Sequence, residues 1–383
     1  MSATSVFDNL IDQEHVISIL QEAVSAASDS TNQSQEMTHA WLFTGPPGSG
    51  RSNAALAFAA ALVCRNGGCN DCTDCKTATT GSHADVELIK TEGLSIKIDE
   101  VRDLITRASW SPAVGNYRVV VIEDADRLTE SAANALLKAI EEPGLRTVWL
   151  LCAPSSTDVL PTIRSRTRSL VLRTPSIAAV AKLLEKEKFS PAMADFAARV
   201  SQGHIGRARH LAKSEEARTR RQAILKISLM ITDIASAFKA AQVLVEAAKA
   251  EAEEEAERRD DVEISALKEA WGQQGSKLTQ GGSKAVKELE KEQKSRTTRM
   301  VRDYLDRALL DIATLFRDIL LIQSNSPDSI INTDLISEMT KIAESTEAEA
   351  TLAKLEAIMS ARTNLSHNAA PLLTIEALMV LLK

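Results

Sequence analysis

The chain has 383 residues, of which 44% are apolar and 25% charged, and its formal net charge is −7. This length favours two or three domains, and the composition is that of a folded globular protein and not of a disordered or fibrous one. The acidic balance argues against a protein that coats nucleic acid through charge alone. The sequence shows neither a basic leader nor an apolar run approaching the roughly 18 residues of a spanning helix, so we expect a cytoplasmic protein.

Short apolar runs alternate with helical patterns in the first half of the chain. The runs cover residues 41–44, 86–90, 118–122, 148–152 and 169–172. This alternation predicts an α/β fold with a parallel sheet. After Thr174-Pro175 the strand pattern stops, so we expect helices from there to the end, with a break at residues 201–203 and a loosely placed boundary near residue 215.

A charged insertion covers residues 246–300. An acidic, alanine-rich run (246–263) precedes a Gly/Gln/Ser stretch (272–283), and a basic run from Lys284 to Arg302 follows. This order predicts a solvated helix, a flexible hinge and a second helix. We favour charged faces kept in water over a contact of the basic run with nucleic acid or a partner protein.

A glycine-rich loop follows the first apolar run. Its pattern is that of a phosphate-binding loop, G-x-x-x-x-G-K-[ST], except that arginine replaces the lysine. The candidate nucleotide-binding residues are Gly45, Gly48, Gly50, Arg51 and Ser52. Backbone N–H groups of such a loop and the following helix N-terminus attract phosphate, but a planar guanidinium cannot simply replace a compact ammonium. Binding of ATP and Mg²⁺ therefore stays open.

Two carboxylates, Glu123 and Asp124, follow the apolar run 118–122. They occupy the positions at which a working site has Asp and then Glu, to hold Mg²⁺ and to polarise water. The reversed order lengthens one side chain and shortens the other by a methylene. Small misplacements of reacting groups cost about 100-fold in rate, so we do not expect efficient hydrolysis.

Four of the five cysteines lie close together in the sequence, at Cys64, Cys69, Cys72 and Cys75. Four thiolates at this spacing predict a structural Zn²⁺ site with no open coordination position. Neutral thiols packed in a core are the disfavoured alternative, because polar residues stand between them. The fifth, Cys152, ends a predicted strand and is expected to be an inert core thiol.

Further motifs resemble the clamp-loader family of AAA+ proteins. They are FDNLIDQ (7–13), SAANALLKAIEEP (131–143) and LPTIRSRT (160–167), with Thr167 where the family usually has cysteine. The resemblance covers most of residues 5–173. It implies an AAA+ P-loop-type parallel sheet module (1–173) with a zinc-binding insertion (64–75), a helical lid (174–215) and an all-helical C-terminal oligomerisation collar (216–383).

Where the sequence departs from the motor subunits of this family, it resembles the non-motor members. Besides Arg51 and the Glu123-Asp124 order, Ala153-Pro154 stands where motors have a polar sensor residue. For a non-motor member, the resemblance implies that Arg166 acts catalytically in trans, on a nucleotide held by the neighbouring subunit. The other arginines considered for such roles are Arg164, Arg168 and, in the lid, Arg207, which we interpret as a solvated helix residue.

The resemblance also implies an assembly. It predicts a subunit of the DNA polymerase III holoenzyme, in a heteropentamer with delta and gamma/tau subunits that loads the sliding clamp on primer–template DNA. The segment 287–299 resembles actinobacterial members. Two alternatives remain: an ATP-hydrolysing motor subunit of the gamma/tau type, and a stand-alone zinc-dependent nucleic-acid-binding module.

Overall fold

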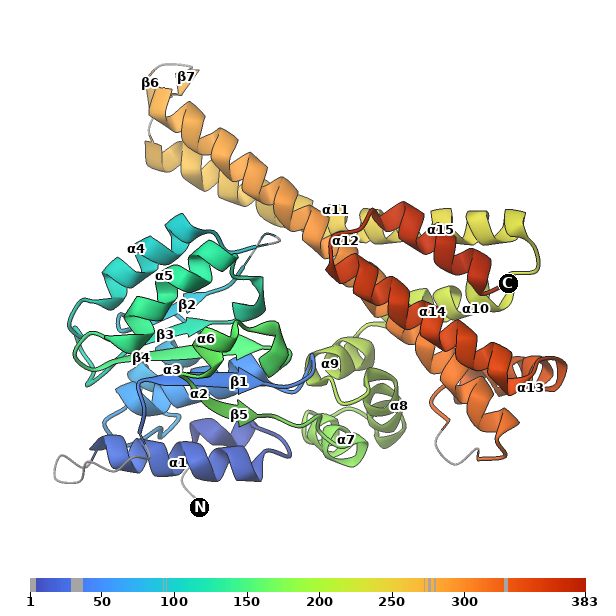
Figure 1. Ribbon diagram of the computed structural model, residues 1–383, viewed down its shortest axis with the longest axis horizontal. Coiled ribbons are helices and arrows are strands. Elements are labelled where there is room, and N and C mark those ends of the chain that lie inside the picture. Colours follow the sequence, from blue (N-terminus) through green and yellow to red (C-terminus); the bar gives the residue numbers. More distant parts are fainter. Residues whose placement is uncertain are drawn as a thin grey trace. The chain divides into compact units, whose positions relative to one another are not determined.

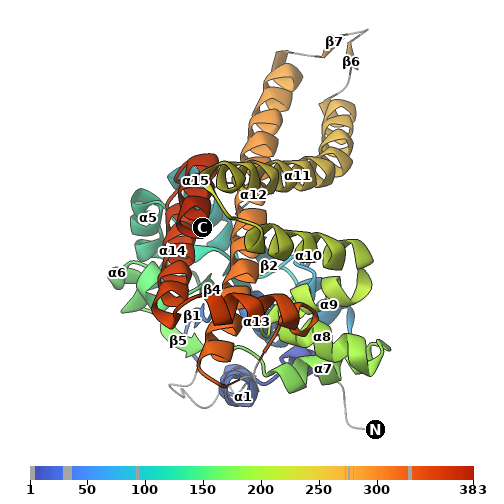
Figure 2. The same ribbon diagram turned by 90° about the vertical axis from the view of Figure 1, so that its right-hand side faces the viewer.

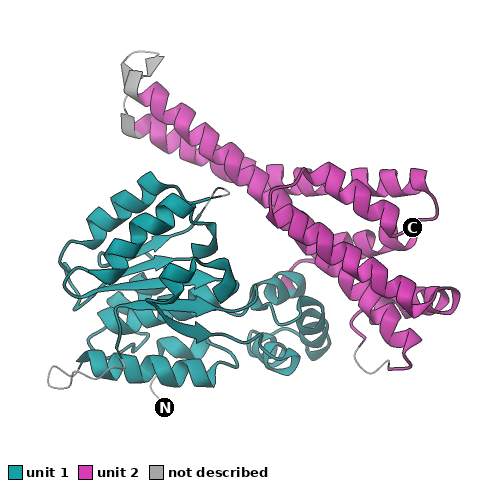
Figure 3. Cartoon of the chain, in the orientation of Figure 1, with its two compact units in different colours: residues 1–212 teal, residues 213–383 magenta. Residues whose placement is uncertain are grey.

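The computed structural model describes residues 5–28, 37–91, 93, 95–271, 273–274, 277–278, 280–326 and 330–383. The chain divides into two compact units, residues 1–212 and 213–383 (Figure 3). Four residues of the expected hinge between Gly272 and Ser283, at positions 272, 275, 276 and 279, lie outside the described residues.

Unit 1 contains the predicted parallel sheet. Its strands, in spatial order, are β2 (Val86–Ile89), β3 (Arg118–Ile122), β4 (Thr147–Ala153), β1 (Ala40–Thr44) and β5 (Arg168–Val171). Each begins and ends within one residue of its predicted bounds. Because β4 alone separates β1 from β3, the carboxyl ends of these two strands lie near each other at one edge of the sheet, where ligands bind in open α/β sheets.

Helices cover both faces of this sheet (Figure 1). One face packs against α1 (Glu14–Ser28), α2 (Arg51–Val63) and α3 (Thr73–Thr79), and the other against α4 (Ile98–Ala108) and α5 (Glu130–Glu141). Alternate residues of each strand serve the two layers: Trp41 and Phe43 belong to the first core, and Leu42 belongs to the second. The short elements are η1 (Val6–Asn9), η2 (Ala125–Arg127), η3 (Ser156–Asp158) and α6 (Pro161–Arg164).

Unit 1 ends with three short helices, α7 (Ile177–Lys186), α8 (Pro191–Ser201) and α9 (Ile205–Lys213). Serine side chains accept hydrogen bonds from backbone N–H groups at the starts of α7 and α8, and Pro191 occupies the first turn of α8. The predicted break after Ser201 is present, since Gln202 and Gly203 have φ angles of 51° and 84° that end α8.

Unit 2 is helical. Its helices are α10 (Glu215–Leu229), α11 (Ile234–Trp271), α12 (Gln280–Gln323), η5 (Thr333–Leu335), α13 (Ile336–Ser345), α14 (Ala348–Ser366) and α15 (Pro371–Leu381), with a short antiparallel pair, β6 (Gln273–Gln274) and β7 (Lys277–Leu278). Helices α11 and α12 form a long hairpin that carries the charged insertion (Figures 1 and 2). Among the described residues, we find no helix with the length and apolar character needed to cross a membrane.

The acidic and basic runs of this hairpin pair with each other. Arg296 of α12 is only 6% exposed, and its Nη2 lies 2.7 Å from a carboxylate oxygen of Asp260 and 2.6 Å from one of Glu263, both on α11. Gln293, one turn earlier, also donates to Glu263 at 3.2 Å. The insertion therefore departs from the expectation of solvated charged faces, because part of its charge is used to join the two helices.

We expect this pairing to make the hairpin sensitive to acid. The Arg296 guanidinium holds the pKa of Glu263 at about 2, below the ordinary 4.5. A lowered carboxyl pKa gives stability that is complete above pH 4.5 and is lost as the pH falls towards 2. Thermal unfolding followed from pH 6 to pH 2 should show a steeper loss for the wild type than for Arg296→Met. Lys294→Met, which changes an exposed neighbour, should keep the wild-type slope.

Candidate functional site

The phosphate-loop motif lies between the end of β1 and the start of α2. Its glycines Gly45, Gly48 and Gly50 have positive φ angles of 154°, 86° and 90°, which few other residues adopt. Arg51 turns back on the loop itself, because its Nη1 donates to the carbonyl oxygen of Gly45 at 2.9 Å. The guanidinium that replaces the expected lysine thus binds protein backbone.

A histidine after α8 packs against the same loop. A Cβ atom placed on Gly48 would lie 2.5 Å from Cγ of His204, so the imidazole ring touches the glycine backbone. The ring is held from the other side, since its Nδ1 accepts the backbone N–H of Arg207 at 3.2 Å. No sequence motif marks His204 beyond its place after the break at 201–203. His204 and Arg51 thus both contact the phosphate loop from within the chain.

The two carboxylates after β3 lie at the same edge of the sheet as the loop. Lys90, which follows β2, places its Nζ 3.3 Å from Oε1 of Glu123, and Ser52 also hydrogen-bonds to this carboxylate. Burial raises the pKa of Glu123, and the positive charge of Lys90 counteracts part of that rise. The structure therefore brings Ser52 of α2 and Glu123 together, and the carboxylate in the metal position already has a lysine as its counter-ion.

Arg166 lies on the surface, just after α6. Its side chain is 41% exposed, and its Nε pairs with the carboxylate of Glu141 at the end of α5. Nη1 donates to the carbonyl oxygen of Thr162 at 3.1 Å and to Oγ of Ser165 at 3.2 Å. The guanidinium is therefore accessible from outside the chain and is held in one orientation by groups from two helices.

The other candidate arginines are placed differently. Arg164 is exposed, with Nη1 3.5 Å from the carbonyl oxygen of Ser156. Arg168, in β5, stacks on the ring of Trp41 at 4.9 Å from its centre. Arg207 is half-buried in α9.

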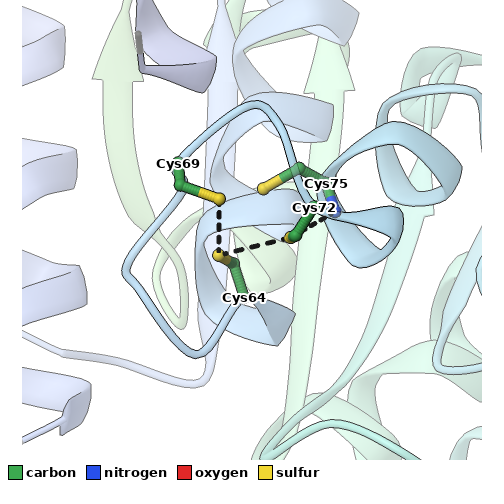
Figure 4. A group of neighbouring side chains, drawn as sticks. All are labelled: Cys64, Cys69, Cys72 and Cys75. Atoms are coloured by element: carbon green, nitrogen blue, oxygen red, sulfur yellow. Dashed lines mark hydrogen bonds between the residues drawn. The ribbon is translucent and has the colours of Figure 1, made fainter. Parts of the chain in front are cut away.

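The four predicted metal ligands come together between the end of α2 and the start of α3 (Figure 4). The sulfur atoms of Cys64, Cys69, Cys72 and Cys75 all lie within 4.8 Å of one another. Cys64 Sγ is 3.8 Å from that of Cys69 and 3.7 Å from that of Cys72. Tetrahedral zinc with Zn–S bonds of 2.3 Å requires sulfur atoms about 3.8 Å apart, so the residues fit Zn²⁺.

The surroundings of the cluster suit a bound cation. Backbone N–H groups of Asp71 and Cys72 hydrogen-bond to the sulfur of Cys69 and lower its pKa to about 6. Burial raises the pKa of Cys75, which is fully enclosed in the core around α2. Cys152 is likewise buried, in β4, away from the cluster, and burial raises its pKa, as expected of an inert thiol.

Known proteins resemble part of this chain. Residues 20–176 match the family described as "DNA polymerase III, delta subunit". The delta' subunit of DNA polymerase III from Bacillus subtilis is 31% identical over 211 residues, 54% of this chain and 64% of that protein. The delta' subunit from Pseudomonas aeruginosa is 38% identical over 134 residues, 33% of this chain and 41% of that protein. The gamma/tau subunit from Mycobacterium tuberculosis H37Rv is 32% identical over 172 residues, 44% of this chain and 28% of that protein.

The sheet order, the phosphate loop after β1 and the paired carboxylates after β3 define a P-loop-type α/β module followed by a helical part, the architecture that the resemblance to AAA+ proteins predicts. Within that class, the family match over residues 20–176 and the two delta' relatives make the chain similar to delta-prime-type members of the clamp-loader family. The chain spans less than two thirds of the length of each of these relatives.

Proposed function

We propose that this protein is a non-motor subunit of a DNA polymerase III clamp loader that supplies Arg166 to the ATP site of a neighbouring subunit. Its partners would be delta and gamma/tau subunits, in a heteropentamer that opens the sliding clamp and places it on primer–template DNA. The names of the relatives, all subunits of DNA polymerase III, support this setting. An arginine presented in trans stabilises the charge that spreads over a transferred phosphoryl group.

The contrast between two parts of unit 1 carries the proposal. Side chains of the chain itself contact its own loop and carboxylate, since Arg51 donates to the carbonyl oxygen of Gly45 and Lys90 pairs with Glu123. Arg166, by contrast, is exposed and oriented on the surface. A chain whose own loop and carboxylate are engaged in this way, and whose surface presents a guanidinium, is suited to bind the phosphates of a neighbouring subunit's nucleotide.

The surface of unit 2 supports a role in assembly. Large apolar side chains are exposed on its helices, namely Ile234 and Phe238 of α11, Leu352 and Met359 of α14, and Leu373 and Leu381 of α15. Exposed apolar surface of this kind is typical of protein interfaces. We propose that residues 216–383 form the oligomerisation collar and that residues 174–215 form the lid.

Reconstitution of the complex with candidate motor subunits tests the role of Arg166. We expect Arg166→Ala to lower DNA- and clamp-stimulated ATP hydrolysis about tenfold, because the site that receives Arg166 loses its transition-state stabilisation and turnover of the assembled ring depends on that site. Arg164→Ala, two residues away and also exposed, is the matched control and should stay near wild type. Unchanged turnover with Arg166→Ala in a fully assembled complex would refute the proposal.

The alternative is a motor subunit, and the gamma/tau relatives at 32% identity favour it. A motor must bind and hydrolyse ATP at its own loop. We expect the isolated chain to show no ATP turnover above a protein-free blank, and Arg51→Ala to leave this result unchanged. Turnover by the isolated chain that disappears with Arg51→Ala would favour the motor.

A further inference from the structure

Arg166 is held by a carboxylate from another helix. Glu141 is the last residue of α5, 25 positions earlier in the chain, and its Oε1 accepts the hydrogen bond of Arg166 Nε. We propose that Glu141 is a positioning residue, which fixes the guanidinium of Arg166 in the orientation that reaches a phosphate on the neighbouring subunit. This inference rests on the proposed function.

Arg166 uses the Nε and Nη1 atoms of its guanidinium for hydrogen bonds within the chain. A guanidinium has five N–H donors: one on Nε and two on each terminal nitrogen. Nε donates to Glu141, while Nη1 donates to the carbonyl oxygen of Thr162 at 3.1 Å and to Oγ of Ser165 at 3.2 Å. These three bonds fix the plane of the group, and no hydrogen bond from Nη2 is found among the residues that the structure describes, so this end can meet an external oxygen.

The place of Glu141 in its helix indicates that it serves a purpose other than helix stability. The carboxyl end of a helix carries partial negative charge, so a glutamate there is unfavourable. Residues that conflict with local preference tend to lie at functional sites. Arg166 offsets the charge of Glu141, and because both side chains are more than 40% exposed (41% and 46%), their pairing adds little to folding stability.

Loss of the positioning contact should act on turnover and leave nucleotide binding by the neighbour intact. A free arginine side chain samples many rotamers, so fewer of the assembled complexes hold the guanidinium near the phosphate at any moment. This loss lowers kcat. The KM for ATP should change little, because the nucleotide is bound chiefly by the neighbour's own loop.

The test uses the full reconstituted complex and steady-state ATP hydrolysis with DNA and clamp. We expect Glu141→Ala to lower kcat about fivefold with little change in KM. Glu141→Gln, whose amide oxygen can still accept the Nε–H bond, should restore most of the turnover. Glu142→Ala removes the adjacent exposed carboxylate and is the matched control. Thermal unfolding of each variant shows whether the fold is intact.

A double-mutant cycle with Arg166→Ala separates this inference from the proposed function. If Glu141 acts through Arg166, adding Glu141→Ala to Arg166→Ala should cause no further loss. A low turnover for Arg166→Ala together with wild-type kcat for Glu141→Ala would overturn the positioning role alone. A higher kcat for Glu141→Ala would overturn it too, since the carboxylate would then restrain the arginine. Wild-type turnover for Arg166→Ala would refute the proposed function itself.

Discussion

Replacing Cys69 by serine should remove one equivalent of bound zinc per chain and lower the melting temperature of the α/β module by roughly 10 °C. Structural zinc contributes apparent binding free energies of about 10–16 kcal/mol in small zinc-binding peptides, and part of that is folding free energy. A loss of about 4 kcal/mol corresponds to a shift of this size for a unit of about 200 residues. Zinc content by elemental analysis and unfolding by calorimetry measure both effects.

The position of the cysteine cluster explains why we expect the loss of zinc to destabilise more than the loop that carries the four cysteines. Cys64 and Cys75 belong to the core that α2 forms with the sheet. The carbonyl oxygen of Gly68, between Cys64 and Cys69, accepts a hydrogen bond from the backbone N–H of Val6 at 3.0 Å. This bond joins η1 to the loop that carries the cysteines. A zinc-free variant should therefore also loosen the segment around η1, and hydrogen exchange there should quicken.

Cys152→Ser is the control for this experiment. It removes the fifth cysteine, which lies buried in β4, and should leave the zinc content at one per chain. It still lowers stability, because it buries a hydroxyl group. Wild-type protein that contains no zinc after metal-free purification and reloading, and melts unchanged with a chelator, would contradict a structural metal.

Features encoded in short, contiguous stretches could be predicted from the sequence. The strands at 118–122 and 148–152 are apolar runs long enough to be read directly, and the cysteine cluster needs only twelve residues and two glycines. The phosphate loop was recognisable for the same reason. Its closeness to Glu123 depends on the strand order, since only β4 lies between β1 and β3 and parallel strands end at one edge of the sheet.

Contacts between distant residues could not be predicted in this way. The approach of His204 to Gly48 joins positions 48 and 204, and no periodicity specifies it. The pairing of Glu141 with Arg166 depends on how α5 and α6 pack and on a side-chain rotamer. The charged insertion shows the same limit: its composition predicted helices, but not that Arg296 would be buried between them.

Unit 2 contains a buried polar network that no sequence motif indicates. Arg221 of α10 and Asp311 of α12 are 5% and 3% exposed, and their side chains meet at 2.8 Å between Nε and Oδ1. Arg221 also donates to Oδ1 of Asn332. Asp318, fully buried on α12, accepts the side-chain and backbone N–H groups of Asn332 at 2.8 and 2.7 Å. The network thus ties α10, α12 and the segment before η5 together.

Arg221→Met should cost about 3–5 kcal/mol of unfolding free energy, because it leaves the carboxylate of Asp311 buried without its guanidinium. For a helical unit of about 170 residues, this corresponds to a melting temperature lower by roughly 10 °C or more. Chemical denaturation of the full chain, with a probe in unit 2, measures the change. The adjacent Arg220→Met is the matched control: Arg220 is 38% exposed in its pairing with Glu216 and Glu251, and its loss should cost less than about 1 kcal/mol.

The double variant Arg221→Met with Asp311→Leu tests how much the buried ion pair contributes to the free energy of unfolding. A buried ion pair stabilises little relative to well-packed apolar residues, since desolvation of both charges offsets their attraction. We therefore expect the double variant to recover much of the loss, with a coupling energy of about 2–3 kcal/mol between the two positions. Additive losses would mean that each side chain is held by separate partners. Recovery would mean that the pair fixes how α10 meets α12 while adding little net stability.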